Sequence, residues 1–195
     1  IHIVPNSRNQ PAEFMETQFP ILVEKLGLLT DSGGAGEFRG GLGYEKKYRV
    51  LVDCNVIVTA DRVRLGCYGV NGGKAGKAFG VYVDAADGSK KLGGLVDKEP
   101  IKAGEVFLVC TTGGGGWGNP LERSVEQVLL DVLQNKVSKT SARDDYGVMI
   151  VNTGDGLTVD KKATNLLRKT KQKERGDEVE IIDRGPGINL FEATD

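Results

Sequence analysis

The chain contains 195 residues, of which 39% are hydrophobic, and it carries a formal net charge of −1 at pH 7. A chain of this length can bury a hydrophobic core as one domain, and its nearly balanced charge argues against a nucleic acid or an anionic membrane as partner. No apolar run approaches the roughly 20 residues that span a bilayer, and no signal peptide is recognised, so the expected location is the cytoplasm.

The first two thirds of the chain predict a β-rich region. A short helix is expected to begin after Asn9 and to end before Pro20. Strands rich in Val, Ile and Tyr follow, and Asp87-Gly88 is a typical hairpin turn between two of them. A bend or a hairpin is predicted at Asp53-Cys54. The predicted strands cover residues 21–29, 44–52, 55–63, 80–84, 90–96 and 106–110, with a turn at 100–104.

The last third predicts two to three helices. Apolar residues recur with helical spacing between Val125 and Leu133, and Ser124 with Gln127 forms a capping box at the start of this helix. Asp160 is predicted to cap a further helix. The remaining expectations are a short helix at 141–146, a strand at 148–151, a helix end near 173 with Ala163, Leu166, Leu167 and Thr170 facing inward, and an edge strand at 179–182.

These patterns predict an α+β fold that is predominantly antiparallel β in its first two thirds, with glycine-rich turns, and helical in its last third. One β-rich domain with carboxy-terminal helices is expected over residues 1–173, and an extended tail over residues 174–195. Since the first residue is not methionine, the chain is expected to be a processed or excised piece of a longer protein.

Glycine is the most conspicuous component, because 21 of the 28 glycines lie between residues 31 and 118. Rigid glycine turns can present main-chain N–H donors that need no rearrangement when negative charge develops on a ligand. No catalytic residue is predicted, but these turns suggest a site for a phosphate or an oxyanion. Its candidate lining is Asp31, Ser32, Gly33, Gly34 and Arg39, followed by Gly113, Gly114, Gly115 and Gly116.

These candidates also have structural alternatives. In the structural alternative, Asp31 and Arg39 pair with one another and stabilise the turn between strands. The glycine run at 113–118 matches the spacing of a dinucleotide-binding loop, but the next helix begins only after Ser124, which argues against a dinucleotide site. Trp117, in the same run, either packs the loop onto the core or forms a wall of a contact with substrate or with another subunit.

The only histidine is His2, so neither a zinc site nor a Ser-His-Asp triad can be built from the body of the chain. The three cysteines, Cys54, Cys67 and Cys110, lack metal-binding spacing and are expected to be reduced, buried thiols. No metal ligand is therefore predicted here, and the reactive groups of an enzyme would have to come largely from other polypeptide.

Several short strings follow one another along the chain. They are Asn9-Gln10-Pro11-Ala12-Glu13, Asp31 to Gly36, Arg39 to Gly43, Asp61-Arg62, Gly113 to Gly118 with Pro120 and Glu122-Arg123, Ala142-Arg143, and Tyr146-Gly147-Val148. In this order and spacing they resemble the carboxy-terminal third of the hydantoinase B/oxoprolinase family, over about residues 9–168. The ending Ile182-Asp183-Arg184-Gly185-Pro186 is also similar to the tail of that family.

The resemblance implies an ATP-dependent, hetero-oligomeric enzyme. A hydantoinase A-type partner subunit would use ATP to activate a carbonyl oxygen as its phosphate, and the B-type subunit would handle the activated intermediate. The outcome would be hydrolysis of a cyclic amide, such as a hydantoin, 5-oxoproline or a lactam. In relatives that resemble acetone and acetophenone carboxylases it would instead be carboxylation of a ketone enol. An alternative of another class is a non-catalytic assembly module of such a complex.

The resemblance also implies that the remaining part of the B-type subunit is a partner of this chain. The histidines and acidic groups that would hold a metal in the carboxylase relatives are expected to lie in that remaining part. ATP and a divalent metal are thus expected in the complex, whereas this chain alone is expected to bind no cofactor and to be inactive.

Overall fold

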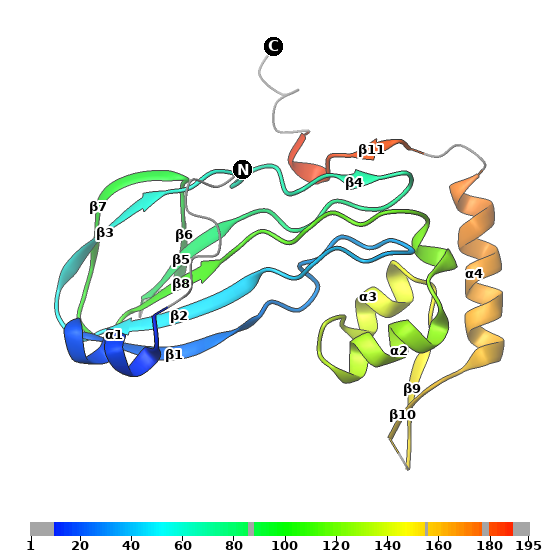
Figure 1. The fold of residues 1–195 in the computed structure, drawn as a ribbon, viewed down its shortest axis with the longest axis horizontal. Coiled ribbons are helices and arrows are strands. Elements are labelled where there is room, and N and C mark those ends of the chain that lie inside the picture. Colours follow the sequence, from blue (N-terminus) through cyan, green and yellow to red (C-terminus); the bar gives the residue numbers. More distant parts are fainter. Residues whose placement is uncertain (1–9, 86–87, 155, 177–179, 189–195) are drawn as a thin grey trace. The chain divides into compact units, whose positions relative to one another are not determined.

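The structure is a computed structural model that describes residues 10–85, 88–154, 156–176 and 180–188 (Figure 1). The chain divides into two compact units. Unit 1 comprises residues 1–27, 45–59 and 81–109, and unit 2 comprises residues 28–44, 60–80 and 110–195. The two units alternate along the sequence, so neither coincides with the boundary expected at residue 173.

Unit 1 contains most of the β-structure. The main sheet has five strands in the order β1-β2-β8-β5-β6, and β3 pairs with β7 in a separate two-stranded sheet. Side chains alternate along these strands, so that Val81 and Val83 are buried while Tyr82 and Asp84 are only half-buried. The elements are α1 (Ala12–Gln18), β1 (Ile21–Leu28), β2 (Tyr44–Val50), β3 (Cys54–Thr59), β5 (Gly80–Ala85), β6 (Gly88–Leu92), β7 (Leu95–Ile101) and β8 (Val106–Cys110).

Two strand connections differ from those that the sequence predicted. The hairpin alternative at Asp53-Cys54 is wrong, because β2 and β3 lie in different sheets. The single strand predicted at 90–96 is also wrong, since β6 ends at Leu92 and β7 begins at Leu95 in the other sheet. The two glycines between them have no side chains to pack on a sheet surface, which favours a change of direction there. The β5–β6 hairpin is confirmed and antiparallel, and its turn at 86–87 lies outside the described residues.

Pro100 lies within β7, opposite Asn55 of β3, rather than in the predicted turn. Proline has no N–H to donate and is normally excluded from central strands. A two-stranded sheet leaves one edge of each strand unpaired, so it can accommodate proline. The turn itself comes slightly later, where Glu105 N donates to Lys102 O at 3.0 Å.

Unit 2 contains a set of extended, glycine-rich segments that pack main chain against main chain. Gly34 N donates to Gly114 O at 2.8 Å, and a Cβ atom added at Gly34 would lie 1.9 Å from the carbonyl oxygen of Lys74. A Cβ atom at Gly113 would lie 1.7 Å from the carbonyl oxygen of Ser32. Such close approach excludes any side chain, which explains the concentration of glycine. We call this set the glycine-packed frame; its segments are 28–44, 60–80 and 110–118.

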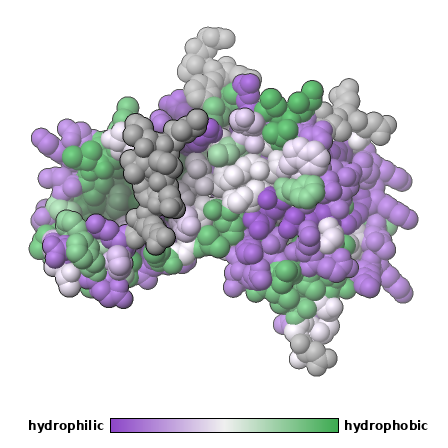
Figure 2. All heavy atoms as spheres, viewed as in Figure 1, coloured by the Kyte–Doolittle hydropathy of each residue, from purple (hydrophilic) through white to green (hydrophobic). Residues whose placement is uncertain are grey.

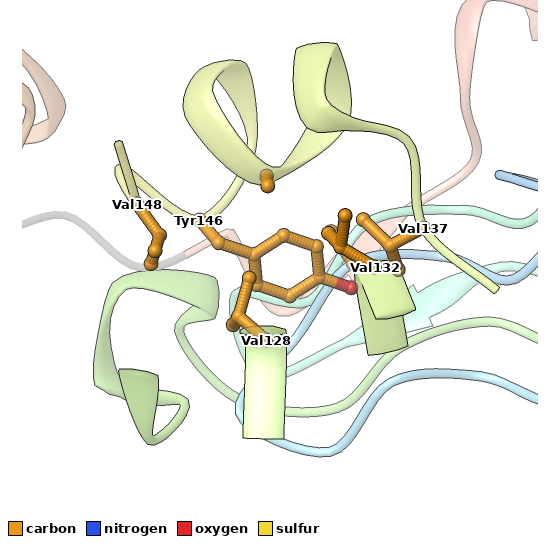
Figure 3. Packing of buried hydrophobic residues seen from close by; sticks show 7 residues of the cluster. Val128, Val132, Val137, Tyr146 and Val148 are labelled. Carbon is orange, nitrogen blue, oxygen red and sulfur yellow. The ribbon is translucent and has the colours of Figure 1, made fainter. Parts of the chain in front are cut away.

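The rest of unit 2 is largely helical and surrounds a small side-chain core. The ring of Tyr146 lies among Val128, Val132 and Val137 (Figure 3). Ala35 of the glycine-packed frame joins the same cluster. The elements are β4 (Gly69–Val70), η1 (Pro120–Glu122), α2 (Val125–Leu133), α3 (Lys139–Asp144), β9 (Ile150–Thr153), β10 (Gly156–Val159), α4 (Lys161–Arg175), β11 (Ile182–Asp183) and η2 (Pro186–Ile188).

The predicted helix starts are confirmed for α2 and α4, whereas Asn9, expected before the first helix, lies outside the described residues. In α2 the Ser124 hydroxyl accepts a hydrogen bond from Gln127 N at 3.1 Å. The short helix begins earlier than predicted, because Ser138 rather than a later residue caps it by accepting from Ser141 N at 3.0 Å. With sheets that pair antiparallel and helices in the last third, the α+β class is confirmed.

The inward face of α4 is partly different from the prediction. Its cap is confirmed, since Asp160 accepts from Ala163 N, but Leu166 is 69% exposed and Thr170 is also exposed. Thr164 is buried instead, because its hydroxyl accepts a hydrogen bond from Met149 N at 3.0 Å. A polar contact therefore sets the rotation of this helix, which an apolar pattern could not reveal.

The carboxy-terminal segment returns to the glycine-packed frame. Strand β11 pairs antiparallel with β4, so the edge strand predicted at 179–182 is found only at Ile182 and continues to Asp183, whereas residue 179 lies outside the described residues. The Asp183 carboxylate accepts from Ala75 N at 2.9 Å and from Gly185 N at 2.7 Å. The segment 180–188 is thus bonded to the frame.

Candidate functional site

A polar cavity of about 560 Å³ opens on unit 2. Its walls come from three parts of the chain, residues 31–35 and 74–77 of the glycine-packed frame and residues 138–145 around α3. Ammonium groups, carboxylates and hydroxyls line it, so the cavity suits a small polar ligand better than an apolar one.

One wall is an ordered hydrogen-bonded cluster. Lys74 Nζ lies 2.6 Å from Asp145 Oδ1, and the Ser141 hydroxyl donates to Asp145 Oδ2 at 2.6 Å. The hydrogen bond from Arg143 lowers the pKa of Asp144, so this carboxyl is ionised near neutral pH and is no proton donor there. These residues are suited to binding and orienting a ligand.

The Lys77 ammonium group and the Gly33 N–H are among the donors of the lining residues that are not used within the described part of the chain. Lys77 is exposed, and neither its ammonium group nor the N–H of Gly33 has a partner among the described residues. The hydroxyl of Thr140 lies on the same cavity. An anionic group in the cavity could therefore accept hydrogen bonds from an ammonium group and a main-chain amide.

The structure brings Asp31, Gly33 and Gly34 of the predicted lining to this cavity. Asp31 has a positive φ of 57°, and its carboxylate accepts a hydrogen bond from Ser138 N at 2.7 Å. Asp31 therefore ties the glycine turn to the start of α3. Its carboxylate shapes the cavity wall through that bond.

Ser32 lies beneath the cavity wall and is completely buried. Its hydroxyl donates to Leu29 O at 2.5 Å and accepts from Gly43 N at 2.9 Å. Both capacities of the hydroxyl are used within the frame. Ser32 is placed to hold the frame together.

Arg39 pairs with Asp131 of α2, so the alternative that paired it with Asp31 is wrong. The Arg39 Nε lies 3.1 Å and the Arg123 Nη2 lies 2.9 Å from the same oxygen, Asp131 Oδ2. Two guanidinium groups thus share one carboxylate in a largely buried cluster, where Arg123 Nε is buried without a partner among the described residues. This cluster joins the glycine-packed frame to the helical part.

The second predicted run, Gly113 to Gly116, lies inside the frame. Gly113 N donates to Lys77 O, Gly114 N to Gly41 O and Gly116 N to Lys74 O, whereas Gly115 N has no partner among the described residues. Three of the four amides are consumed by main-chain packing. The next residue, Trp117, is half-exposed and its ring contacts that of Phe38, with 5.6 Å between centroids.

Most of the side chains on the cavity were not among the predicted site residues. They are Lys74, Lys77, Thr140, Ser141 and Asp145. The two lysines follow Gly73 and Gly76, and no local pattern around them predicts a site. The two hydroxyls belong to α3 and Asp145 directly follows it, so the cap at Ser138 was the one local signal available. Only the tertiary arrangement brings these segments together.

The described residues contain no group of three or more His, Cys, Asp or Glu side chains arranged to hold a metal ion. His2 lies outside them. The described residues therefore do not fit a metal centre. In the part of the chain that the structure describes, no helix combines the length and apolar character needed to cross a bilayer.

Comparison with known proteins decides the family. The family model for hydantoinase B/oxoprolinase matches residues 1–120. The chain belongs to the hydantoinase B/oxoprolinase family. The resemblance drawn from the glycine-rich strings is thereby confirmed.

Three relatives illustrate this membership. An uncharacterised protein of Methanocaldococcus jannaschii is 39% identical over 82% of this chain. A proposed B-type subunit of a D-/L-hydantoinase from a Pseudomonas species is 32% identical over 84%, and the caprolactamase β-subunit of Pseudomonas jessenii is 35% identical over 80%. The chain spans only 28%, 28% and 27% of these relatives, respectively.

Two solved structures share the fold. The crystal structure of ATP-dependent caprolactamase from Pseudomonas jessenii matches with a TM-score of 0.70 and 32% identity, over 82% of this chain and 28% of that one. Nucleotide-free acetone carboxylase matches with a TM-score of 0.72 and 20% identity, over 88% of this chain and 27% of that one. The second likeness concerns the fold alone.

Proposed function

We propose that this chain is the carboxy-terminal part of a B-type subunit in an ATP-dependent complex that hydrolyses a cyclic amide through a phosphorylated intermediate. The observation that carries this proposal is the 35% identity, over 80% of the chain, to the β-subunit of caprolactamase. That relative is named for a lactam, which is a cyclic amide, and its solved structure is described as ATP-dependent. A hydantoin or 5-oxoproline belongs to the same class of substrate.

In the proposed reaction a partner subunit of the hydantoinase A type transfers the γ-phosphoryl group of ATP to the amide oxygen. Water then adds to the activated carbon, the C–N bond breaks and phosphate leaves. The products are ADP, phosphate and the ring-opened amino acid. A cytoplasmic location, where ATP is available, belongs to the same proposal.

This chain would contribute a rigid polar wall for the activated intermediate. The glycine-packed frame fixes the main chain around Gly33 and Lys77, which line the cavity and whose donors are not used within the described residues. Donors that are already in place stabilise developing negative charge without reorganisation. We therefore expect Lys77 and Gly33 to face the phosphate or carboxylate of the bound species.

The test is an activity screen of the complete complex. Hydantoins and lactams with ATP would be compared with ketones plus bicarbonate, measuring ADP release and product. Ring opening without carboxylation is the expected result. Carboxylation of a ketone would overturn the proposal in favour of the carboxylase reaction, for which the shared fold of acetone carboxylase is the only support.

A second candidate is a purely structural role for this chain in assembling the complex. It is favoured by the internal use of the Ser32 hydroxyl, the Arg39 guanidinium and three of the four N–H groups at Gly113–Gly116. Lys77→Ala in the full complex discriminates the two, with Lys91→Ala on the exposed face of β6 as control. Lost turnover with intact assembly supports the cavity, whereas full turnover of Lys77→Ala supports the assembly role.

A further inference from the structure

Helix α4 is strongly basic in an otherwise acidic chain. It carries seven of the 26 Lys and Arg residues and a single acidic one, Glu174. The rest of the chain therefore has seven more acidic than basic side chains. Figure 2 shows hydrophilic residues covering the right-hand edge of unit 2, where α4 lies in Figure 1.

The basic residues of α4 divide between two faces. On the inner face, Arg168 donates to the carbonyl oxygens of Tyr146 at 3.1 Å and Arg123 at 2.8 Å, and Lys171 donates to Asp144 O at 2.9 Å. Arg175, further along, is also hydrogen-bonded within unit 2. Arg168, Lys171 and Arg175 are therefore held by contacts within the fold.

The outer face is different. Lys162, Leu166, Lys169 and Lys173 follow one another at spacings of four, three and four residues, which places them in one stripe on the helix. All four are exposed, Leu166 by 69%. None of the three lysines has a carboxylate partner among the described residues. We call these four residues the outer stripe.

We propose that the outer stripe docks an acidic segment of another polypeptide in the assembled protein, with Leu166 against an apolar side chain of that segment. The unneutralised lysines supply charge complementarity for carboxylates. A central exposed leucine flanked by lysines matches an amphipathic partner, which presents an apolar residue between acidic ones.

Two other polyanions fit less well. A nucleic acid offers phosphates but no apolar contact for Leu166, and the acidic remainder of the chain would repel it. A membrane-bound helix usually buries a broad apolar face, whereas the outer stripe contains one leucine among three lysines. The narrow stripe therefore favours a protein segment.

The first experiment is zero-length carbodiimide cross-linking of the native complex, followed by peptide mass spectrometry. We expect Lys162, Lys169 or Lys173 to be joined to Asp or Glu residues of another polypeptide of the complex, and cross-links found only within the protein's own polypeptide would contradict this. Acetylation of the same lysines by acetic anhydride should fall at least fivefold in the complex relative to the full-length protein separated from its partners. Equal acetylation in both states, or cross-links only to Asp177 or Glu178 nearby, would overturn the proposal.

The second experiment is charge reversal in the full-length protein. The variant Lys162→Glu/Lys169→Glu/Lys173→Glu should weaken assembly at least tenfold and abolish the cross-links. The matched control Lys91→Glu/Lys98→Glu/Lys139→Glu makes the same charge change at exposed lysines elsewhere and should assemble normally. Equal assembly by both variants, or binding of the wild type to phosphatidylserine vesicles or duplex DNA that only the first variant loses, would also overturn it.

Discussion

The glycine-packed frame and the helical core of unit 2 are stabilised in opposite ways. In the frame, main-chain atoms approach so closely that a single added carbon at Gly34 or Gly113 would lie within 2 Å of a carbonyl oxygen. In the core, the side chains of Val128, Tyr146 and Val148 are buried with at most 1% exposure. The frame is therefore sensitive to added atoms, and the core is sensitive to removed ones.

The largest effect is expected from Gly113→Ala. The new Cβ would lie 1.7 Å from Ser32 O, and main-chain atoms cannot move aside without breaking the frame. We expect a loss of more than about 4 kcal/mol of unfolding free energy, or no folded protein. Gly41→Ala is the matched control, because nothing lies within 4 Å of its Cβ. Denaturant unfolding of the full-length protein measures both, and equal stability would refute close packing of the frame.

The next effect tests the cluster that joins the two regions. Asp131→Asn removes the only carboxylate shared by Arg39 and Arg123 and leaves two largely buried cations together. We expect a loss of about 3 to 5 kcal/mol of unfolding free energy. Glu45→Gln, which breaks the more exposed pair with Lys25, should cost at most about 1 kcal/mol. If the two variants unfold at the same denaturant concentration, the cluster does not stabilise the junction.

A smaller effect is expected in the core. Val128→Ala removes two buried carbons from a fully buried position and leaves a cavity beside Tyr146. The expected cost is about 2 to 3 kcal/mol in thermal or denaturant unfolding. Leu166→Ala, on the exposed side of α4, should change stability by less than about 0.5 kcal/mol. A larger loss of stability for Leu166→Ala than for Val128→Ala would show that the core lies elsewhere.

The smallest expected effect on stability is seen only at alkaline pH. Burial raises the pKa of the Tyr146 hydroxyl, so the folded protein keeps this proton where the unfolded chain loses it. The stabilisation of the folded state by this protonated hydroxyl is complete below about pH 10. Above that pH it decreases by up to about 1.4 kcal/mol per pH unit. The difference in unfolding free energy between wild type and Tyr146→Phe should therefore shift with pH only above about pH 10. A constant difference from pH 8 to 11 would contradict it.

The sequence by itself determined the family, the α+β class and the starts of α2 and α4. These depend on local rules, since Ser124 and Asp160 cap helices through bonds to residues three positions away. The density of glycine likewise identified the frame. Local patterns depend on residues that are close in the sequence, so they can be recognised without knowledge of the rest of the fold.

Only the tertiary structure decided what the glycines do and where the cavity lies. Arg39 meets Asp131 across 92 positions, and Lys74 meets Asp145 across 71. Three of the four N–H groups at Gly113–Gly116 bond to other main-chain segments. Distant pairings of this kind depend on how segments pack in three dimensions. Glycine has no side chain, so its place in the sequence does not predict which segment it contacts.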